Sequence, residues 1–320
     1  MTLEATPIRG NIRSPQFRRV SHGLFLEIAT GLSEDAEWRR DLGAWRYVLA
    51  GSAMFTGLTG ARLAGWALPV VSRDWTPIFV AVSAPDPTVR RAGLVVSQFR
   101  RGPDHRPWIV DGLPLDHPEE ILLRCARDLD LIDLVVLVES ALRARDVTYR
   151  ALHRITETRR PGVRLLRRAV ELAEPRSESP METVLRLLLW CAGVPVDVQS
   201  PLVDPDGREL GRADLRVRGT NLLVEYDGGE HRDPARHAAD IRRERLIGDL
   251  DLRRRAYTLP ELTQRPAVVM AELDRILGRT PRPRRLARWR GLVTGSTYDP
   301  AGRRRVRSRW AVAMGTITRW

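Results

Sequence analysis

The segment Arg208-Glu-Leu-Gly-Arg-Ala-Asp-Leu-Arg-Val-Arg-Gly-Thr-Asn-Leu-Leu-Val-Glu-Tyr-Asp227 decides the fold of the second half of the chain. Apolar and polar residues alternate on both sides of Gly219-Thr220, a pattern typical of two half-buried strands joined by a hairpin turn. A two-residue loop of type II′ with Gly219 first would pair Arg218 with Asn221. The segment therefore predicts an antiparallel hairpin with a defined register.

Counting back from this turn brings acidic side chains together. The register sets Leu215 opposite Val224 on an apolar face, and Asp214 opposite Glu225 on the face that also carries Asp227. Directly opposed residues have Cβ atoms about 4.5–5.5 Å apart, and like charges there destabilise a sheet. A divalent cation such as Mg²⁺ or Mn²⁺, held by both carboxylates, would compensate for this repulsion.

The same face has a second interpretation, in which arginines neutralise the carboxylates on a solvated surface. Arg212, Arg216 and Arg232 are the candidates for that role. Asp227 precedes Gly228 and is equally compatible with a turn or with an ion pair to Arg212. The residue pattern alone leaves both interpretations open.

Helix and strand signals surround the hairpin. Ser179-Pro-Met-Glu182 predicts a helix start with Ser as N-cap, Pro at the first position and Glu at the third. The expected order from there is α-β-β-β-α-β-α. The expected strands are 196–203, 208–218, 221–227 and 252–258, and the later helices are 232–250 and 260–277.

Several motifs of this region resemble a known family. Asp214-Leu, Val224-Glu-Tyr-Asp-Gly228, His231-Arg and Asp240-x-x-Arg243 look like the endonuclease-like domain of many actinobacterial proteins. That domain is similar to the very-short-patch-repair endonucleases, within the restriction-endonuclease-like PD-(D/E)xK superfamily. The resemblance covers about residues 175–278 and implies an α/β fold with an αβββαβα core.

The resemblance also implies an activity, metal-dependent DNA cleavage with Mg²⁺ or Mn²⁺. Its metal ligands would be Asp214 and Glu225, with Arg232 as a further supporting residue. Asp227 occupies the position where the family usually has Lys, and the chain contains no Lys, so His231 or Arg232 would take that role. The residues implied as catalytic are Asp214, Glu225, Asp227, His231 and Glu182, and Asp240 and Arg243 would brace the site.

Each of these residues also has an ordinary structural role. Glu182 can close a capping box by reaching back to Ser179. His231 can be a surface histidine, and Asp240 and Arg243 are three residues apart on an expected helix, where a salt bridge is common.

The first half resembles, more weakly, the AbiEi antitoxin family of type IV toxin–antitoxin systems. Residues 17–26, with a turn at His22-Gly23, look like the wing of its winged helix, and residues 49–66 look like the start of its next domain. Only about sixteen residues precede the wing, so we expect either a truncated winged-helix region or a misassigned start codon. The pattern predicts helices at 35–49 and 50–68, strands at 77–82 and 92–99, and a helical stretch at 121–142 with a break near Asp128.

Together, the patterns and resemblances predict that the chain has four consecutive parts. They are a remnant of a winged-helix-like region at 1–48, an AbiEi-like α+β domain at 49–160, a restriction-endonuclease-like domain at 161–278, and an Arg-rich tail at 279–320. The tail carries twelve Arg and one acid, so it holds +11 of the net charge of +13. The arginines expected to contact phosphates are Arg284, Arg285, Arg288, Arg303, Arg304 and Arg305, with Trp289 and Trp310 as stacking groups. The alternative is a solvated extension without a role, and in both cases we expect the core to survive its removal.

The amino-acid composition excludes several classes of protein. With two cysteines in 320 residues, a disulfide scaffold and a Cys-rich zinc site are excluded, and a reducing, cytoplasmic setting fits. The chain has neither a membrane-length apolar run nor the apolar region of a signal peptide. We therefore expect a DNA endonuclease of defence, repair or toxin–antitoxin type. The alternative is a non-catalytic, antitoxin-like DNA-binding regulator with a degenerate nuclease fold. DNA is the expected partner, and a homodimer and a toxin are further candidates.

Overall fold

The computed structural model describes residues 6–72, 74, 76–99, 106–203, 207, 209–228, 248 and 251–314. The chain is a mixed α/β protein that divides into two compact units. The first comprises Met1–Asp128, Val147–Leu166 and Arg304–Trp320, and the second comprises Leu129–Asp146 and Arg167–Arg303. Both units are discontinuous in sequence, so they differ from the consecutive parts expected from the sequence. Within the described residues, no helix is both long and apolar enough to cross a membrane.

The first unit contains a small sheet and a larger one. The small sheet has the order β1-β3-β2 and is followed by helix α1 (Glu34–Arg46). Its strands are β1 (Ile8–Arg9), β2 (Phe17–Ser21) and β3 (Leu24–Glu27). β2 and β3 are antiparallel, which confirms the ribbon predicted at 17–26, and Gly23 takes the positive φ of 65° that the turn requires.

The larger sheet of the first unit has the order β6-β5-β4-β8-β7. Its strands are β4 (Met54–Phe55), β5 (Ile78–Ser83), β6 (Leu94–Phe99), β7 (Trp108–Val110) and β8 (Leu113–Leu115). Helices α2 (Gly57–Leu63), α3 (Pro118–Cys125) and α5 (Tyr149–Thr156) lie in the same unit. The helix predicted over 50–68 is wrong in its first part, because Met54 and Phe55 pair with β5 before α2 begins.

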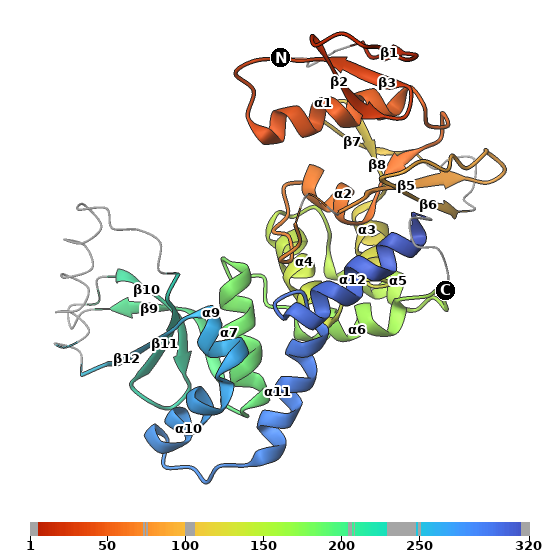
Figure 1. The fold of residues 1–320 in the computed structure, drawn as a ribbon. Helices are drawn as coiled ribbons and strands as arrows, with labels where there is room; N and C mark the ends of the chain where they lie inside the picture. Colours follow the sequence, from red (N-terminus) through yellow and green to blue (C-terminus); the bar gives the residue numbers. More distant parts are fainter. Residues whose placement is uncertain are drawn as a thin grey trace. The chain divides into compact units, whose positions relative to one another are not determined.

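The second unit is built on a four-stranded sheet of order β12-β11-β10-β9 (Figure 1). Its strands are β9 (Val196–Val203), β10 (Glu209–Val217), β11 (Leu222–Tyr226) and β12 (Arg253–Tyr257). β10 runs antiparallel to both β9 and β11, and β12 runs parallel to β11. β11 lies inside the sheet, and Leu222, Leu223 and Val224 are all buried, so both of its faces are covered.

Helices complete the second unit. They are α4 (Leu131–Arg143), α7 (Pro180–Cys191), α9 (Leu259–Gln264), α10 (Pro266–Ile276) and α11 (Pro283–Gly295). α7 packs against β11, α4, α9 and α11. The closing helix predicted over 260–277 is two helices, because Arg265 takes a non-helical backbone conformation before Pro266 opens α10.

The C-terminal segment is folded. α11 belongs to the second unit, whereas α6 (Val163–Leu172) and α12 (Pro300–Ala313) each begin in one unit and end in the other. Trp289 and Trp310 are 0% and 1% exposed, respectively. Trp289 and Trp310, which the sequence predicted as stacking groups for nucleic acid, are therefore core residues, so that prediction is wrong for both of them.

Candidate active site on the β9–β12 sheet

Helix α7 brings Glu182 to the sheet. Ser179 caps the helix as predicted, and its Oγ accepts a hydrogen bond of 3.2 Å from the Glu182 N–H. The Glu182 carboxylate accepts from the backbone N–H of Glu178 at 2.8 Å and from the Gln199 amide at 2.9 Å. The predicted capping box is therefore displaced by one residue, and Glu182 is also joined to strand β9.

The hairpin has the predicted register. Leu215 pairs with Val224 and Arg216 pairs with Leu223, and continuation of this register sets Asp214 opposite Glu225. The turn differs from the expected type II′ loop. The Thr220 N–H donates to the Val217 carbonyl, so Gly219, with φ of 72°, is the third residue of the turn and not the second.

Asp214 lies where the two strands of the hairpin end their regular pairing. Its Oδ2 accepts the backbone N–H of Tyr226 at 2.9 Å, so a side chain replaces a ladder carbonyl at this point. On its other side the pairing of Ala213 with Ser200 and of Leu215 with Val198 sets Asp214 opposite Gln199. A polar row therefore crosses three strands, from Gln199 through Asp214 to Glu225.

Glu225 is 3% exposed and is held by an arginine that sequence reasoning missed. Arg254 Nε donates to its Oε2 at 2.6 Å. Arg254 lies on β12 and pairs in register with Leu223, two residues before Glu225 on the same face. The sequence could have indicated this contact, because the helix expected over 232–250 predicts a β-α-β connection, which favours parallel neighbouring strands.

Asp227 continues the β11 strand and is exposed. Its N–H donates to the Tyr257 carbonyl of β12 at 3.0 Å, so it extends the parallel ladder instead of making a turn. Arg212, one of the expected neutralising arginines, pairs with Glu178 at 2.9 Å, and Arg216 donates to the Thr220 carbonyl. A cation beside Glu225 is thus contributed by β12, through Arg254.

Four predicted site residues, His231, Arg232, Asp240 and Arg243, lie outside the described residues, as does most of the helix expected over 232–250. In the part of the chain that the structure describes, no three His, Cys, Asp or Glu side chains form a metal-binding group. Asp214 and Glu225 each stand next to a residue of the last regular pair, Leu215 with Val224, so the register brings two hard carboxylate donors to neighbouring positions. That pair suits Mg²⁺ or Mn²⁺, which are commonly bound through one or two carboxylates and several further oxygen atoms.

The six tail arginines have different surroundings. Arg285 donates to Asp274 at 3.2 Å and Arg303 donates to the Thr297 carbonyl at 2.7 Å, so both hold the local fold. The guanidinium of Arg288 lies 3.6 Å from the centroid of the Trp190 ring. The other three are exposed on their helices, and they are Arg284, Arg304 and Arg305.

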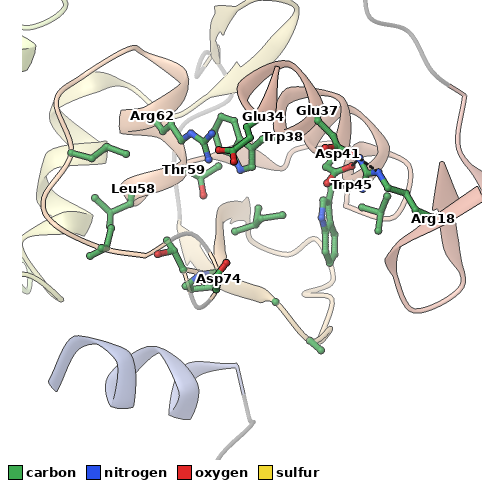
Figure 2. A pocket seen from close by; sticks show the side chains of 18 residues that line it. Arg18, Glu34, Glu37, Trp38, Asp41, Trp45, Leu58, Thr59, Arg62 and Asp74 are labelled. Carbon is green, nitrogen blue, oxygen red and sulfur yellow. Dashed lines mark hydrogen bonds and ion pairs between the residues drawn. The ribbon is translucent and has the colours of Figure 1, made fainter. Parts of the chain in front are cut away.

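The first unit contains a cavity of about 660 Å³ that sequence reasoning did not predict (Figure 2). Arg18 makes a salt bridge of 2.7 Å to Glu37 and a paired hydrogen bond to Asp41 on one side of the cavity. On another side the guanidinium of Arg62 lies 3.8 Å from the centroid of the Trp38 ring. Burial raises the pKa of Asp41 despite its Arg18 partner. The walls carry both signs of charge, so their chemistry favours no single class of ligand.

Two curated proteins of Mycobacterium tuberculosis are similar to this chain. They are the uncharacterized protein MT2308 of strain CDC 1551 / Oshkosh and the uncharacterized protein Rv2248 of strain ATCC 25618 / H37Rv. Each is 26% identical over 235 residues, which cover 72% of this chain and 86% of the relative. No family model matches the chain, and no solved structure matches it. The similarity extends over most of both chains and carries no activity with it.

Proposed function

We propose that the protein is a metal-dependent DNA endonuclease whose site is the polar row on the β9–β12 sheet. The observation that carries the proposal is the hairpin register, whose last regular pair, Leu215 with Val224, directly precedes Asp214 and Glu225 on two neighbouring strands. The order of the elements supports the same proposal. In the chain, α7 precedes a β9–β10–β11 meander, and β12 then lies parallel to β11. This order fits the restriction-endonuclease-like core that the sequence resembles.

In this proposal Asp214 and Glu225 would hold Mg²⁺ or Mn²⁺. When bound, the ion supplies a nucleophilic water and stabilises negative charge on the phosphodiester. The protein's own groups orient these ligands. The Tyr226 N–H fixes one oxygen of Asp214, and Arg254 fixes one oxygen of Glu225. Arg254 also brings a permanent positive charge to the site of a chain that contains no Lys.

The test is cleavage by the purified protein and two matched variants. Asp214→Asn keeps the side-chain shape and can still accept the Tyr226 N–H, but it loses the charge that attracts a divalent cation. Asp197→Asn is the control, since Asp197 is a carboxylate of β9 on the same sheet and pairs with Arg218 at 2.8 Å. We expect Asp214→Asn to lower Mg²⁺- or Mn²⁺-dependent plasmid nicking at least about 100-fold, a loss of roughly 2.7 kcal/mol of transition-state stabilisation. Asp197→Asn should cleave at the wild-type rate.

Nicking must also stop in EDTA. Equal rates for the wild type and Asp214→Asn would refute the assignment of Asp214, and nicking that persists in EDTA would refute the metal.

One observation favours a second function. Arg254 neutralises Glu225 within the protein at 2.6 Å, so the carboxylate has a structural partner that needs no metal. This arrangement suits a non-catalytic DNA-binding regulator that keeps a nuclease-like fold. The same assay separates the two functions, because such a regulator would bind DNA and show no metal-dependent nicking in any variant.

A further inference from the structure

Arginines are concentrated around the start of α11, and three of them, Arg279, Arg285 and Arg288, lie against the C-terminal end of α7. Residues 279–298 contain Arg at positions 279, 282, 284, 285, 288 and 290 and no Asp or Glu. All of them lie in the second compact unit, which also carries Asp214 and Glu225. Asp274, near the end of α10, forms salt bridges with both Arg279 and Arg285, at 3.3 and 3.2 Å.

Two of these arginines hold the local structure. Arg279 donates to the carbonyls of Ala192 and Gly193, at 2.6 and 3.1 Å, and so caps the C-terminus of α7. Arg285 lies against Gly193, because a Cβ added to Gly193 would be 3.8 Å from the Nε of Arg285. Burial and the neighbouring positive charges of Arg285 and Arg282 lower the pKa of Arg279. Positive charges therefore lie close together around Arg279.

The other arginines face outward. Arg282, Arg284, Arg288 and Arg290 are exposed, and Arg284 and Arg288 are one helical turn apart on α11. Arg288 stacks on Trp190 with its guanidinium 3.6 Å from the ring centroid, which holds the cation in a fixed place at the surface. Arg284 and Arg288, together with Arg282 just before the helix, therefore form a positive surface in a segment without acids, whereas Arg290 lies on the other side of α11.

We propose that this surface, formed by Arg282, Arg284, Arg288 and Trp190, binds the phosphate backbone of duplex DNA. Guanidinium groups match phosphate geometry and are always charged. Phosphate contacts position a protein on DNA without reading sequence, so the surface supplies general affinity. The inference rests on the proposed function, since it takes DNA as the substrate of the same unit.

The experiment compares two triple variants that remove equal charge. Arg282→Gln, Arg284→Gln and Arg288→Gln together remove the proposed surface. The control replaces Arg150, Arg154 and Arg164 with Gln, because these are exposed arginines of α5 and α6 in the first unit. Binding to two unrelated 30-base-pair duplexes is measured by fluorescence anisotropy in EDTA at several salt concentrations.

We expect the α11 variant to bind at least about tenfold more weakly near 0.1 M salt, with the slope of log K against log salt reduced by roughly 2–3, since each phosphate contact contributes about 0.9. Both duplexes should lose affinity equally, and the control should keep the wild-type slope. An unchanged slope in the α11 variant would overturn the proposal. An equal loss in the control would also overturn it, because net charge alone would then explain binding.

Folding and catalysis are checked separately. Both triple variants must melt within a few degrees of the wild type, and Arg288→Lys alone must keep most of the affinity because it retains the charge. Loss of affinity in Arg288→Lys equal to that in the triple variant would also contradict the phosphate role. Because the assay contains EDTA and no cleavage step, a failed nicking experiment leaves this result unaffected, and the reverse also holds.

Discussion

Glu225 is buried and depends on Arg254, which is itself about one-third exposed. Removal of the guanidinium leaves a buried carboxylate without the Arg254 donor, in a register that brings Asp214 to the neighbouring strand. We therefore expect Arg254→Gln to lower the free energy of unfolding by about 1–3 kcal/mol, measured by urea denaturation. The same change should be less harmful in an Asp214→Asn background, by at least about 0.5 kcal/mol, because the opposing charge is gone.

The matched control is the next residue along β12. Arg255 pairs with Glu272 at 2.8 Å, and both side chains are substantially exposed. Arg255→Gln should cost less than about 1 kcal/mol and should not depend on residue 214. Equal costs for the two arginines, or no coupling between Arg254 and Asp214, would mean that the two carboxylates do not share an electrostatic environment.

At the scale of elements, a buried carboxylate of α4 accepts hydrogen bonds from the loop between α11 and α12. Asp133 accepts the Thr297 N–H at 3.0 Å and the Thr297 Oγ1–H at 2.7 Å, and it also accepts the N–H of Asp130 at the start of α4. Burial nevertheless raises the pKa of Asp133 to about 7. In the unfolded chain the same group has its ordinary value of 3.8.

This difference predicts a pH dependence with a definite sign. Between about pH 4 and 7 the folded protein keeps a proton on Asp133 that the unfolded chain has lost, so stability falls as pH rises through this range. The full difference corresponds to roughly 4 kcal/mol. We expect Asp133→Asn to be less pH-dependent than the wild type when unfolding is followed in urea at pH 5, 6, 7 and 8. Parallel pH curves for the two proteins would show that Asp133 does not titrate in this range.

At the scale of the whole molecule, the C-terminal segment is part of both cores. Trp289 donates to the Leu262 carbonyl at 2.7 Å, and Trp310 lies edge-on to Phe79 with ring centroids 5.2 Å apart. Deletion of residues 279–320 should therefore abolish cooperative unfolding and not merely weaken DNA binding. Circular dichroism and thermal melting of the truncated protein would check this.

Single substitutions in α12 test the same prediction through smaller changes in stability. Trp310→Ala should cost about 3–5 kcal/mol, as expected for a fully buried aromatic. Val312→Ala, at a side chain 51% exposed on the same helix, should change stability by less than about 0.5 kcal/mol. A truncated protein that melts cooperatively at the wild-type temperature would mean that the segment is dispensable.

The sequence predicted those features that depend on local pattern. Strand β9, the N-cap at Ser179 and the hairpin register followed from alternation, capping chemistry and turn position. The burial of Trp289 and Trp310 could not be predicted, because their partners lie far away along the chain and the surrounding arginines suggested solvent. Arg254 was missed for a related reason, since its contact with Glu225 exists only between two strands brought side by side.

The assignment of Trp310 to the first unit has a consequence for synthesis. Phe79 and Asp128 leave the ribosome long before Trp310, which packs on the first and donates to the second at 3.2 Å. The first unit therefore cannot complete its core until α12 has been made, even though most of its residues are translated much earlier. A late part of the sequence thus completes the unit that contains the earliest part, so the two units do not fold strictly one after the other along the chain.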